Sequence, residues 1–509
     1  MAHLFPFLPF NADETPLSWA TRLSALHTGG RLVPFLNDLG ITYLSIIAGA
    51  TDAVTRLCDA TGQDPAPVLR NAVQKIGKRS YNLRGQVLSA EMLVRPDTRF
   101  CPACLVADSR SALPVNAARY GRVAWQLKTI RTCPLHNMPL MARRLGLWDD
   151  KLSELPVIVP ECIDALQDLA ETATRRPPSP LQDYVLRRLD GAKTHAWLDG
   201  LSLELATTVT EKLGAILTFG TDAKPRELSE ADWDAAGAAG WEFSSRNENG
   251  VCEALALMQK RAAITRTNGI RKTDIFGMTY PWLANRRTFK DLEPVRRVFR
   301  GHYLATMTGL PDDLVFGQPI EEPKFSTPNK IATLEGVDPR TLRNVLVGKG
   351  LVPAASEEGA YLDISVPYAD ALAVAVEMKR AVSASKGMTL LNASRPIWQI
   401  LIDKGYLSGI GVAGEHSTVR CKAVDQVCID QLLQRVEDLT DQVDVAPPKY
   451  RNLAKCAEIC RVPLDTIIPA FLDGRLKTAK RLKSAKGMKA VLLDADDVTS
   501  LLEASSKTK

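Results

Sequence analysis

The sequence predicts a mainly α-helical protein: a helical N-terminal domain with a CxxC/CxxH zinc module, a helical middle domain, and C-terminal repeats of winged helix-turn-helix units with short β-hairpins. Apolar residues recur at helical spacing through most of the chain, two Cys/His pairs lie near the N-terminus, and one segment recurs in the last third. A chain of 509 residues is too long for one ordinary core. We expect domains at 1–148, 149–318, 319–382, 383–445 and 446–509.

The first predicted helices are Leu17–Leu26, which has apolar positions at helical spacing, and Pro67–Ile76, which opens with a proline at a favoured helix start. The Pro-rich segment Thr174–Pro180 is a predicted linker. The middle segment, about 226–307, is expected to be a helical domain that bridges the zinc module and the repeats and offers a partner surface. Its last helix, Pro294–Met307, carries an apolar stripe that should pack against a core.

The last third contains a repeated segment. Asn329–Leu351 and Ala454–Leu476 align without gaps, and Leu390–Leu407 is a looser third copy. Each copy reads as a short helix, a tight turn, a second helix and an exit at a glycine, which is the pattern of a helix-turn-helix. The alternative is that these helical hairpins serve only as scaffold. The exit glycines are Gly350, Gly405 and Gly474.

Each copy is followed by a variable stretch, a short strand that ends in an acid, and a helix. The acids are Asp363, Asp425 and Asp494. We interpret the variable stretch and strand as a β-hairpin wing, so that the whole unit resembles excisionase-like winged helix-turn-helix domains. Gly409–Gly414 matches the dinucleotide pattern G-x-G-x-x-G, but it follows a helix exit and precedes a wing strand. It is therefore interpreted as a wing turn.

The most specific local pattern is a pair of knuckles, FCPACL and CPLHNMPL. Each presents two ligands, and together Cys101, Cys104, Cys133 and His136 make the closed tetrahedral set of a structural zinc site, with one Zn²⁺ per chain. Four protein ligands leave no open position for a catalytic water. The alternative is two unrelated pairs in a core.

Net charge is only +6, but three blocks, Pro65–Ala90, Ser109–Trp148 and Gly474–Leu493, contain Lys and Arg without any acid. Such blocks can match a nucleic-acid backbone, although a solvated face is the alternative. The wing of the third repeat is expected to make the strongest contact with double-stranded DNA, whereas Glu357 and Glu358 in the first wing would repel phosphate. Arg340 and Arg343 are candidates for reading guanine. The predicted DNA-binding residues are Arg119, Arg122, Lys128, Arg131, Arg340, Arg343, Lys477, Lys480, Arg481, Lys483, Lys486 and Lys489.

The ten cysteines are spread over the whole chain, which favours a reducing compartment and a metal site over a disulfide framework. The apolar run Ile41–Ala50 is too short to span a membrane, and the N-terminus does not read as a signal peptide. We therefore expect a cytoplasmic, nucleoid-associated protein with no membrane partner.

The N-terminal motifs resemble the TniQ/TnsD family. The residues that show this resemblance are Ser18, Trp19 and Arg22 in LPFNADETPLSWATRL, the CPACL knuckle, Trp125, and the CPLHNMPL knuckle. A second segment, which resembles the family more weakly, begins at Phe276. The resemblance implies a protein that selects transposon insertion sites and recruits an AAA+ ATPase of the TniB/TnsC type, which in turn engages the transposase. Some relatives join RNA-guided complexes. Family members vary in the C-terminal region that is thought to set the target.

No enzyme motif competes with this interpretation, because the sequence lacks a P-loop, a G-x-S-x-G elbow and an H-E-x-x-H pair. We therefore expect a DNA-binding target-selection adaptor without catalytic residues. The alternatives are a zinc-containing transcriptional regulator and a nuclease with an unrecognised carboxylate site. A neighbouring ATPase gene would favour the first function, and a metal-dependent nicking assay would test the last.

Overall fold

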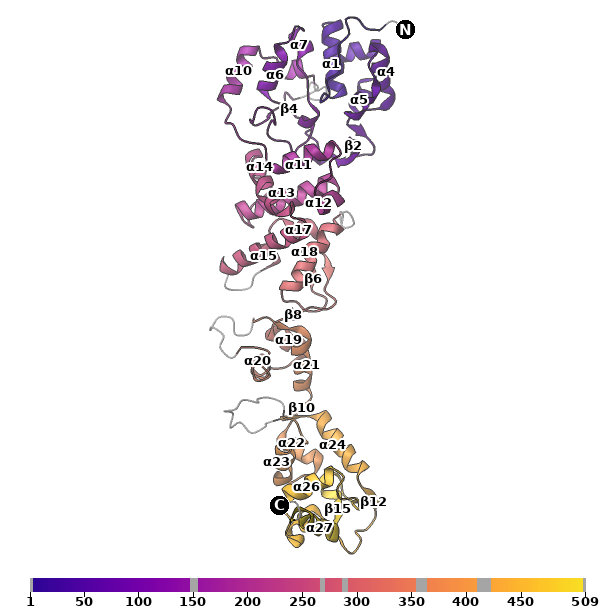
Figure 1. Cartoon of the computed structure of the whole chain (residues 1–509), viewed down its shortest axis with the longest axis vertical. Coiled ribbons are helices and arrows are strands. Elements are labelled where there is room, and N and C mark those ends of the chain that lie inside the picture. The colour runs from indigo at the N-terminus through magenta and orange to yellow at the C-terminus, as the bar shows by residue number, and fades with distance from the viewer. Residues whose placement is uncertain are drawn as a thin grey trace. The chain divides into compact units, whose positions relative to one another are not determined.

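The computed structural model is mainly helical with short strands, as predicted (Figure 1). The chain forms two compact units, Met1–His302 with Phe316–Gln318, and Tyr303–Val315 with Pro319–Lys509. No described helix has the length and apolarity needed to cross a membrane. The residues that the structure describes are 3–146, 154–265, 271–285, 292–353, 364–409 and 423–506.

The first unit begins with a small helical bundle. Its core surrounds the buried Trp19 and Leu23. The predicted helix at 17–26 lies within α1, but the one predicted at 67–76 ends at Arg70, because the Asn71 side chain turns back to donate to the carbonyls of Ala12 and Glu14. The helices are α1 (Pro16–His27), α2 (Leu32–Asp38), α3 (Tyr43–Ile47), α4 (Thr51–Thr61) and α5 (Pro65–Arg70).

A three-stranded antiparallel sheet follows the bundle, with β1 (Gln74–Lys75), β2 (Ser80–Leu83) and β3 (Gln86–Ser89) in sequence order. A single turn of 3₁₀ helix, η1 (Ala90–Met92), leads out of it. Next, β4 (Thr98–Phe100) pairs antiparallel with β5 (Met141–Arg143). This pairing closes the long segment that contains both knuckles.

The core around the knuckles extends past the predicted boundary at residue 148. Leu155, Ile158 and Leu166 belong to the same buried cluster as Phe100 and Trp125. The fold around the two knuckles is therefore completed by the segment that follows it. The elements involved are α6 (Pro102–Ser109), α7 (Val115–Ala118), η2 (Val123–Gln126), α9 (Leu155–Ile158) and α10 (Ile163–Thr172).

The Pro-rich segment at 174–180 has no helix until α11 begins at Pro180, as expected of a linker, yet it is fixed to the second knuckle. The Arg175 guanidinium donates to the carbonyl of His136 at 2.7 Å. The backbone N–H of Arg176 donates to the carbonyl of Asn137 at 2.8 Å. This segment therefore holds the knuckle against the helices that follow.

Those helices pack with unusually close backbones. A Cβ atom on Gly240 of α14 would lie 1.9 Å from the carbonyl oxygen of Thr210 on α13, and one on Gly214 would lie 1.8 Å from that of Ala236. Only glycine allows this approach. The helices are α11 (Pro180–Leu189), α12 (Ala196–Gly200), α13 (Leu203–Phe219), α14 (Glu230–Ser244), α15 (Asn247–Thr265), α16 (Lys272–Phe276), α17 (Thr279–Leu283) and α18 (Glu293–Thr306).

The stripe predicted on the last of these helices is present in part. Val295, Val298 and Phe299 are buried, whereas Thr306 is exposed and Tyr303 takes the buried place on the next turn.

The second unit contains the three predicted repeats, each with two short helices, a tight turn and a third helix. The residue after the first helix has a left-handed backbone in every copy: Gly336, Asn392 and Arg461 have φ of 70°, 48° and 54°. The three exit glycines also have positive φ. The helices are α19 (Pro328–Glu335), α20 (Pro339–Gly348) and α21 (Tyr368–Lys379), then α22 (Ala384–Leu391), α23 (Arg395–Asp403) and α24 (Gln426–Asp438), then α25 (Leu453–Cys460), α26 (Leu464–Leu472) and α27 (Ala495–Ser506).

In each repeat a strand before the first helix pairs antiparallel with a strand before the third helix. Two of these closing strands end at the predicted acids, Asp425 and Asp494; in the first repeat the strand is Val366–Pro367. Asp363, Glu357, Glu358 and the segment 410–422, which hold the first two predicted wings, lie outside the described residues. The pairs are β8 (Phe325–Ser326) with β9 (Val366–Pro367), β10 (Ala381–Ser383) with β11 (Ala423–Asp425), and β13 (Tyr450–Asn452) with β15 (Val491–Asp494).

The first repeat has a core of its own, whereas the second and third share one. The strand β12 (Asp441–Val443), which leaves the second repeat, pairs parallel with β14 (Lys480–Leu482) of the third. The predicted third hairpin, β14 with β15, is present, but it lies inside a four-stranded sheet in the order β12-β14-β15-β13. The boundary expected near residue 445 falls within this shared body.

Candidate metal centre and nucleic-acid interface

The first knuckle is the start of α6. Cys101 occupies the position before the helix, Pro102 fixes its first residue, and Cys104 follows on the same turn. The second knuckle is a tight turn in which the N–H of Cys133 donates to the carbonyl of Met138 at 2.8 Å. Asn137 completes it with a φ of 52°, a conformation that Asn tolerates well. Both knuckles thus aim their ligand atoms into one space.

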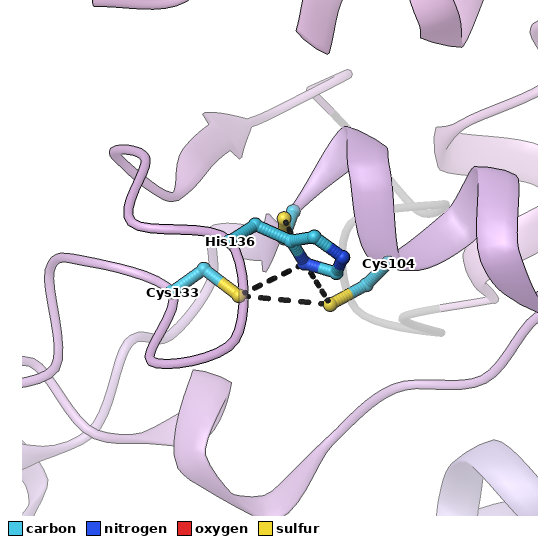
Figure 2. Close-up of side chains that lie close together, drawn as sticks. Cys104, Cys133 and His136 are labelled. Atoms are coloured by element: carbon cyan, nitrogen blue, oxygen red, sulfur yellow. Dashed lines mark hydrogen bonds between the residues drawn. The ribbon is translucent and has the colours of Figure 1, made fainter. Parts of the chain in front are cut away.

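The four predicted ligand atoms lie within 4.8 Å of one another. The His136 Nδ1 atom is 3.6, 3.3 and 3.5 Å from the sulfurs of Cys101, Cys104 and Cys133. The sulfurs of Cys104 and Cys133 are 3.6 Å apart (Figure 2). A tetrahedral ion with bonds of about 2.3 Å to sulfur and about 2.0 Å to nitrogen separates its ligands by about 3.5 to 3.8 Å. The group therefore has the dimensions to hold one metal ion.

The electrostatics of the cluster also favour a cation. Hydrogen bonds with Cys101 and Cys133, together with burial, raise the pKa of the Cys104 thiol. The three cysteines are buried, and His136 is half-buried. Three thiolates this close repel one another unless a positive ion lies between them.

A second constellation lies at the start of α1. The carboxylate of the buried Glu14 is 2.6 Å from the guanidinium of Arg22 and accepts a hydrogen bond from Ser18 at 2.9 Å. Ser18 in turn accepts from the N–H of Gly121, and Arg22 donates to the carbonyl of Ala117. The Ser and Arg of the SWxxR pattern therefore tie α1 to α7 and to the loop that follows it. Trp19 fills the bundle core and donates from Nε1 to the carbonyl of Leu8.

Comparison with known families decides the interpretation of this region. Residues 5–140 match the family model described as TniQ. The chain carries a TniQ domain. No curated protein matches the chain. The matched residues include both knuckles and the Glu14–Arg22 pair, so the resemblance inferred from the motifs is confirmed. TniQ domains occur in proteins associated with transposition, and the match is consistent with a transposition-related role.

Three basic residues of the TniQ domain that were predicted to contact DNA are buried instead. Arg122 is 3.0 Å from the Asp108 carboxylate and lies over the rings of Tyr120 and Trp125. Its role is to brace α6, which carries Cys101 and Cys104.

The other two buried arginines fasten the TniQ domain to later segments. Arg119 donates to Ser109 at 2.8 Å and to the carbonyl of Glu161 at 2.7 Å. Arg131 is 2.6 Å from Glu211 and 3.1 Å from Glu230. The prediction that Arg119, Arg122 and Arg131 bind DNA does not fit this placement, because each guanidinium already has internal partners. Lys128 is exposed.

In the first repeat, the two arginines predicted to read bases are placed differently. Arg340 is exposed beside the start of α20, next to the exposed Thr341. Arg343 is only 4% exposed and packs with the core face of the helix. Arg340 therefore remains a candidate, whereas Arg343 does not fit base reading in this structure. Asn344, one turn after Arg340 and also exposed, is a candidate that composition did not single out.

The six basic residues of the third wing separate into two groups. In β14 the Lys480 ammonium lies over the Tyr450 ring, Arg481 is 2.8 Å from Glu437, and the Lys483 ammonium just after it is 3.6 Å from Asp444. These three side chains therefore have interaction partners within the second unit. The other three, Lys477, Lys486 and Lys489, are exposed, and no side-chain partner is found for them among the described residues.

The second helix of the third repeat, α26, is a structural element. Ile467, Ile468 and Phe471 are buried in the core that the last two repeats share. Tyr406 of the second repeat donates to the Asp473 carboxylate at 2.7 Å just beyond α26. The exposed residues of this helix are Asp465 and Thr466, neither of which is basic, so α26 is a poor candidate for entering a DNA groove.

Proposed function

We propose that this chain is a DNA-binding adaptor that selects insertion sites for transposition and recruits an AAA+ ATPase and, through it, a transposase. The observation that carries the proposal is the TniQ domain at residues 5–140 in one chain with three repeated helical units that expose basic residues. No step of this function requires a catalytic residue. The surface that receives the ATPase is expected on the first unit.

The metal in the TniQ domain is proposed to be one structural Zn²⁺. Three thiolates and one imidazole are a soft ligand set that favours zinc over Mg²⁺ or Ca²⁺. With all four positions filled by protein, the ion stabilises the fold and does not activate water. Its loss should loosen α6 and the second knuckle together, since each supplies two ligands.

Base reading is proposed for α20 of the first repeat. Arg340 and Thr341 lie on the exposed side near the start of this helix, and the start of a recognition helix is the part that contacts base edges. The second repeat offers Arg395 and Gln399 at the corresponding start of α23, both exposed. Because α26 packs into the shared core and exposes no basic residue, the third repeat is proposed to act as a backbone contact and as a support for the second.

The backbone contact is assigned to the three exposed wing lysines. Replacing Lys477, Lys486 and Lys489 together by Ala should weaken binding to all duplex sequences alike. Each phosphate contact contributes about 0.9 to the slope of log affinity against log salt, so the slope should flatten by up to about three units. Fluorescence anisotropy with a labelled duplex measures this.

A control variant replaces three exposed lysines of the first unit, Lys193, Lys224 and Lys260. It carries the same change in net charge and should keep the slope of the unmodified chain. Equal slopes in all three proteins would contradict the assignment of the wing. Absence of duplex binding by the unmodified chain at low salt would contradict the proposed function itself.

A further inference from the structure

A large groove in the first unit lies between the TniQ domain and the helices that follow it, and its volume is about 1020 Å³. Ligand sites span about 300 to 1000 Å³, so this groove has room for several side chains. One wall comes from β3 and the segment around Lys128, and the other from α13, α14 and α17. The apolar lining includes Val87, Leu88, Met92, Leu205, Trp233 and Trp282.

Two cations in this groove form no ion pair with a described residue. Lys212 of α13 lies 5.5 Å from the centre of the Trp282 ring and forms no ion pair with any described residue. Lys128 on the opposite wall is exposed and also has none. Burial lowers the pKa of Lys212 against the attraction of Glu211, so a further anion beside this lysine would offset the cost of burying its charge.

A buried hydroxyl in the same groove is unsatisfied. Thr129 is 5% exposed and lines the groove, and its buried Oγ1 atom has no hydrogen-bond partner among the described residues. A buried polar atom normally finds a partner, because leaving it unpaired costs free energy. A bound carboxylate would accept from this hydroxyl as well as from a neighbouring lysine.

The remaining charges decide between a peptide and a nucleic acid. The carboxylates of Glu91, Glu204 and Glu211 also line the groove. Arg131 neutralises Glu211, whereas Glu204 accepts hydrogen bonds from the N–H and hydroxyl of Ser89 and forms no ion pair with a described residue. A row of phosphates would be repelled here, but a single carboxylate next to an apolar side chain can avoid Glu204.

We propose that this groove binds an extended segment of a partner protein in which an Asp or Glu side chain stands beside an aromatic or aliphatic one. The carboxylate lies near Lys212 and Thr129, and the apolar neighbour packs against Trp233 and Trp282. This site is separate from the DNA contacts of the second unit, and the proposal does not depend on them.

The test is to pan a random-peptide display library on the full chain, with the Lys212→Met chain used for counter-selection. Enriched peptides should carry an acid next to an aromatic or aliphatic residue. They should bind Lys212→Met at least about tenfold more weakly than the unmodified chain. Lys260→Met, which removes an exposed lysine outside the groove, should bind them normally. The metal content of every variant should be unchanged.

Thr129→Val is a second variant with an independent readout. It replaces the unpaired hydroxyl by a methyl group of the same shape. It should therefore raise the melting temperature of the free chain and lower its affinity for the peptides. The proposal is overturned if panning enriches no peptide over the counter-target, if the enriched peptides lack an acid, or if Thr129→Val binds them normally. If a single-stranded oligodeoxythymidine competes with the peptides for this groove, the natural occupant is a nucleic acid and the proposed peptide is wrong.

Discussion

The buried ion pair of Glu14 and Arg22 should stabilise the TniQ domain. The stability of this domain then depends on an arginine that lies outside the metal cluster. Both side chains are less than 5% exposed, and their charged atoms lie 2.6 Å apart. Replacing Arg22 by Met keeps the bulk but leaves the Glu14 carboxylate buried without a counter-ion. Breaking a buried pair costs about 3–5 kcal/mol where the remaining charge stays ionised, and less at a pH where Glu14 takes up a proton.

The same pair predicts a pH dependence. Burial raises the pKa of Glu14 from its ordinary 4.5 to about 7, against the attraction of Arg22. Between these two values the folded domain binds more protons than the unfolded one, so its stability falls as pH rises through that window. The fall amounts to about 3 kcal/mol. Glu14→Gln should remove most of this dependence.

Hydrogen exchange measured by mass spectrometry can follow the effect where it arises, in α1 and in the loop around Gly121. Arg22→Met should lower protection in both segments, because Arg22 and Ser18 join them. The double variant with Glu14→Gln should recover part of the loss, since no unpaired charge remains. If Arg22→Met leaves protection unchanged at pH 7.5, or if Glu14→Gln retains the pH dependence, the pair does not hold the domain together.

Two further predictions concern the metal and the helix packing. Elemental analysis should find one zinc per chain, and Cys104→Ser should abolish it and unfold the knuckle region. Cys162→Ser, at an exposed cysteine, should change neither the zinc content nor the fold. If Cys104→Ser retains zinc, Cys104 does not belong to the site. Gly240→Ala should cost about 1–3 kcal/mol in thermal unfolding, because its Cβ would meet the carbonyl of Thr210. Gly301→Ala has open space and should be neutral or stabilising, so equal effects of the two would show that α13 and α14 are not packed this closely.

The sequence predicts the metal cluster and the repeats well because both depend on short-range patterns. Cys and His at fixed spacing fold into a knuckle locally, and the left-handed residue at each turn ends its helix wherever it occurs. The repeat pattern also located the strands at Asp425 and Asp494 correctly.

The basic blocks were harder to interpret because charge partners come from far along the chain. Arg131 lies in an acid-free stretch of sequence, yet Glu211 and Glu230 reach it from helices about a hundred residues away. The same holds for Arg481, whose partner Glu437 belongs to the preceding repeat. A local count of charges cannot distinguish a basic surface from arginines that neutralise distant carboxylates.

The most direct test of target selection is to map insertions in a reaction reconstituted with the AAA+ ATPase, the transposase and this chain. With the unmodified chain, insertions should cluster at a fixed distance from one bound DNA sequence. With Arg340→Ala, which should lose a base contact worth about 1–3 kcal/mol, that clustering should weaken while insertion itself continues. The account is contradicted if the insertion pattern is the same in three reactions: with the unmodified chain, with Arg340→Ala, and with neither protein present.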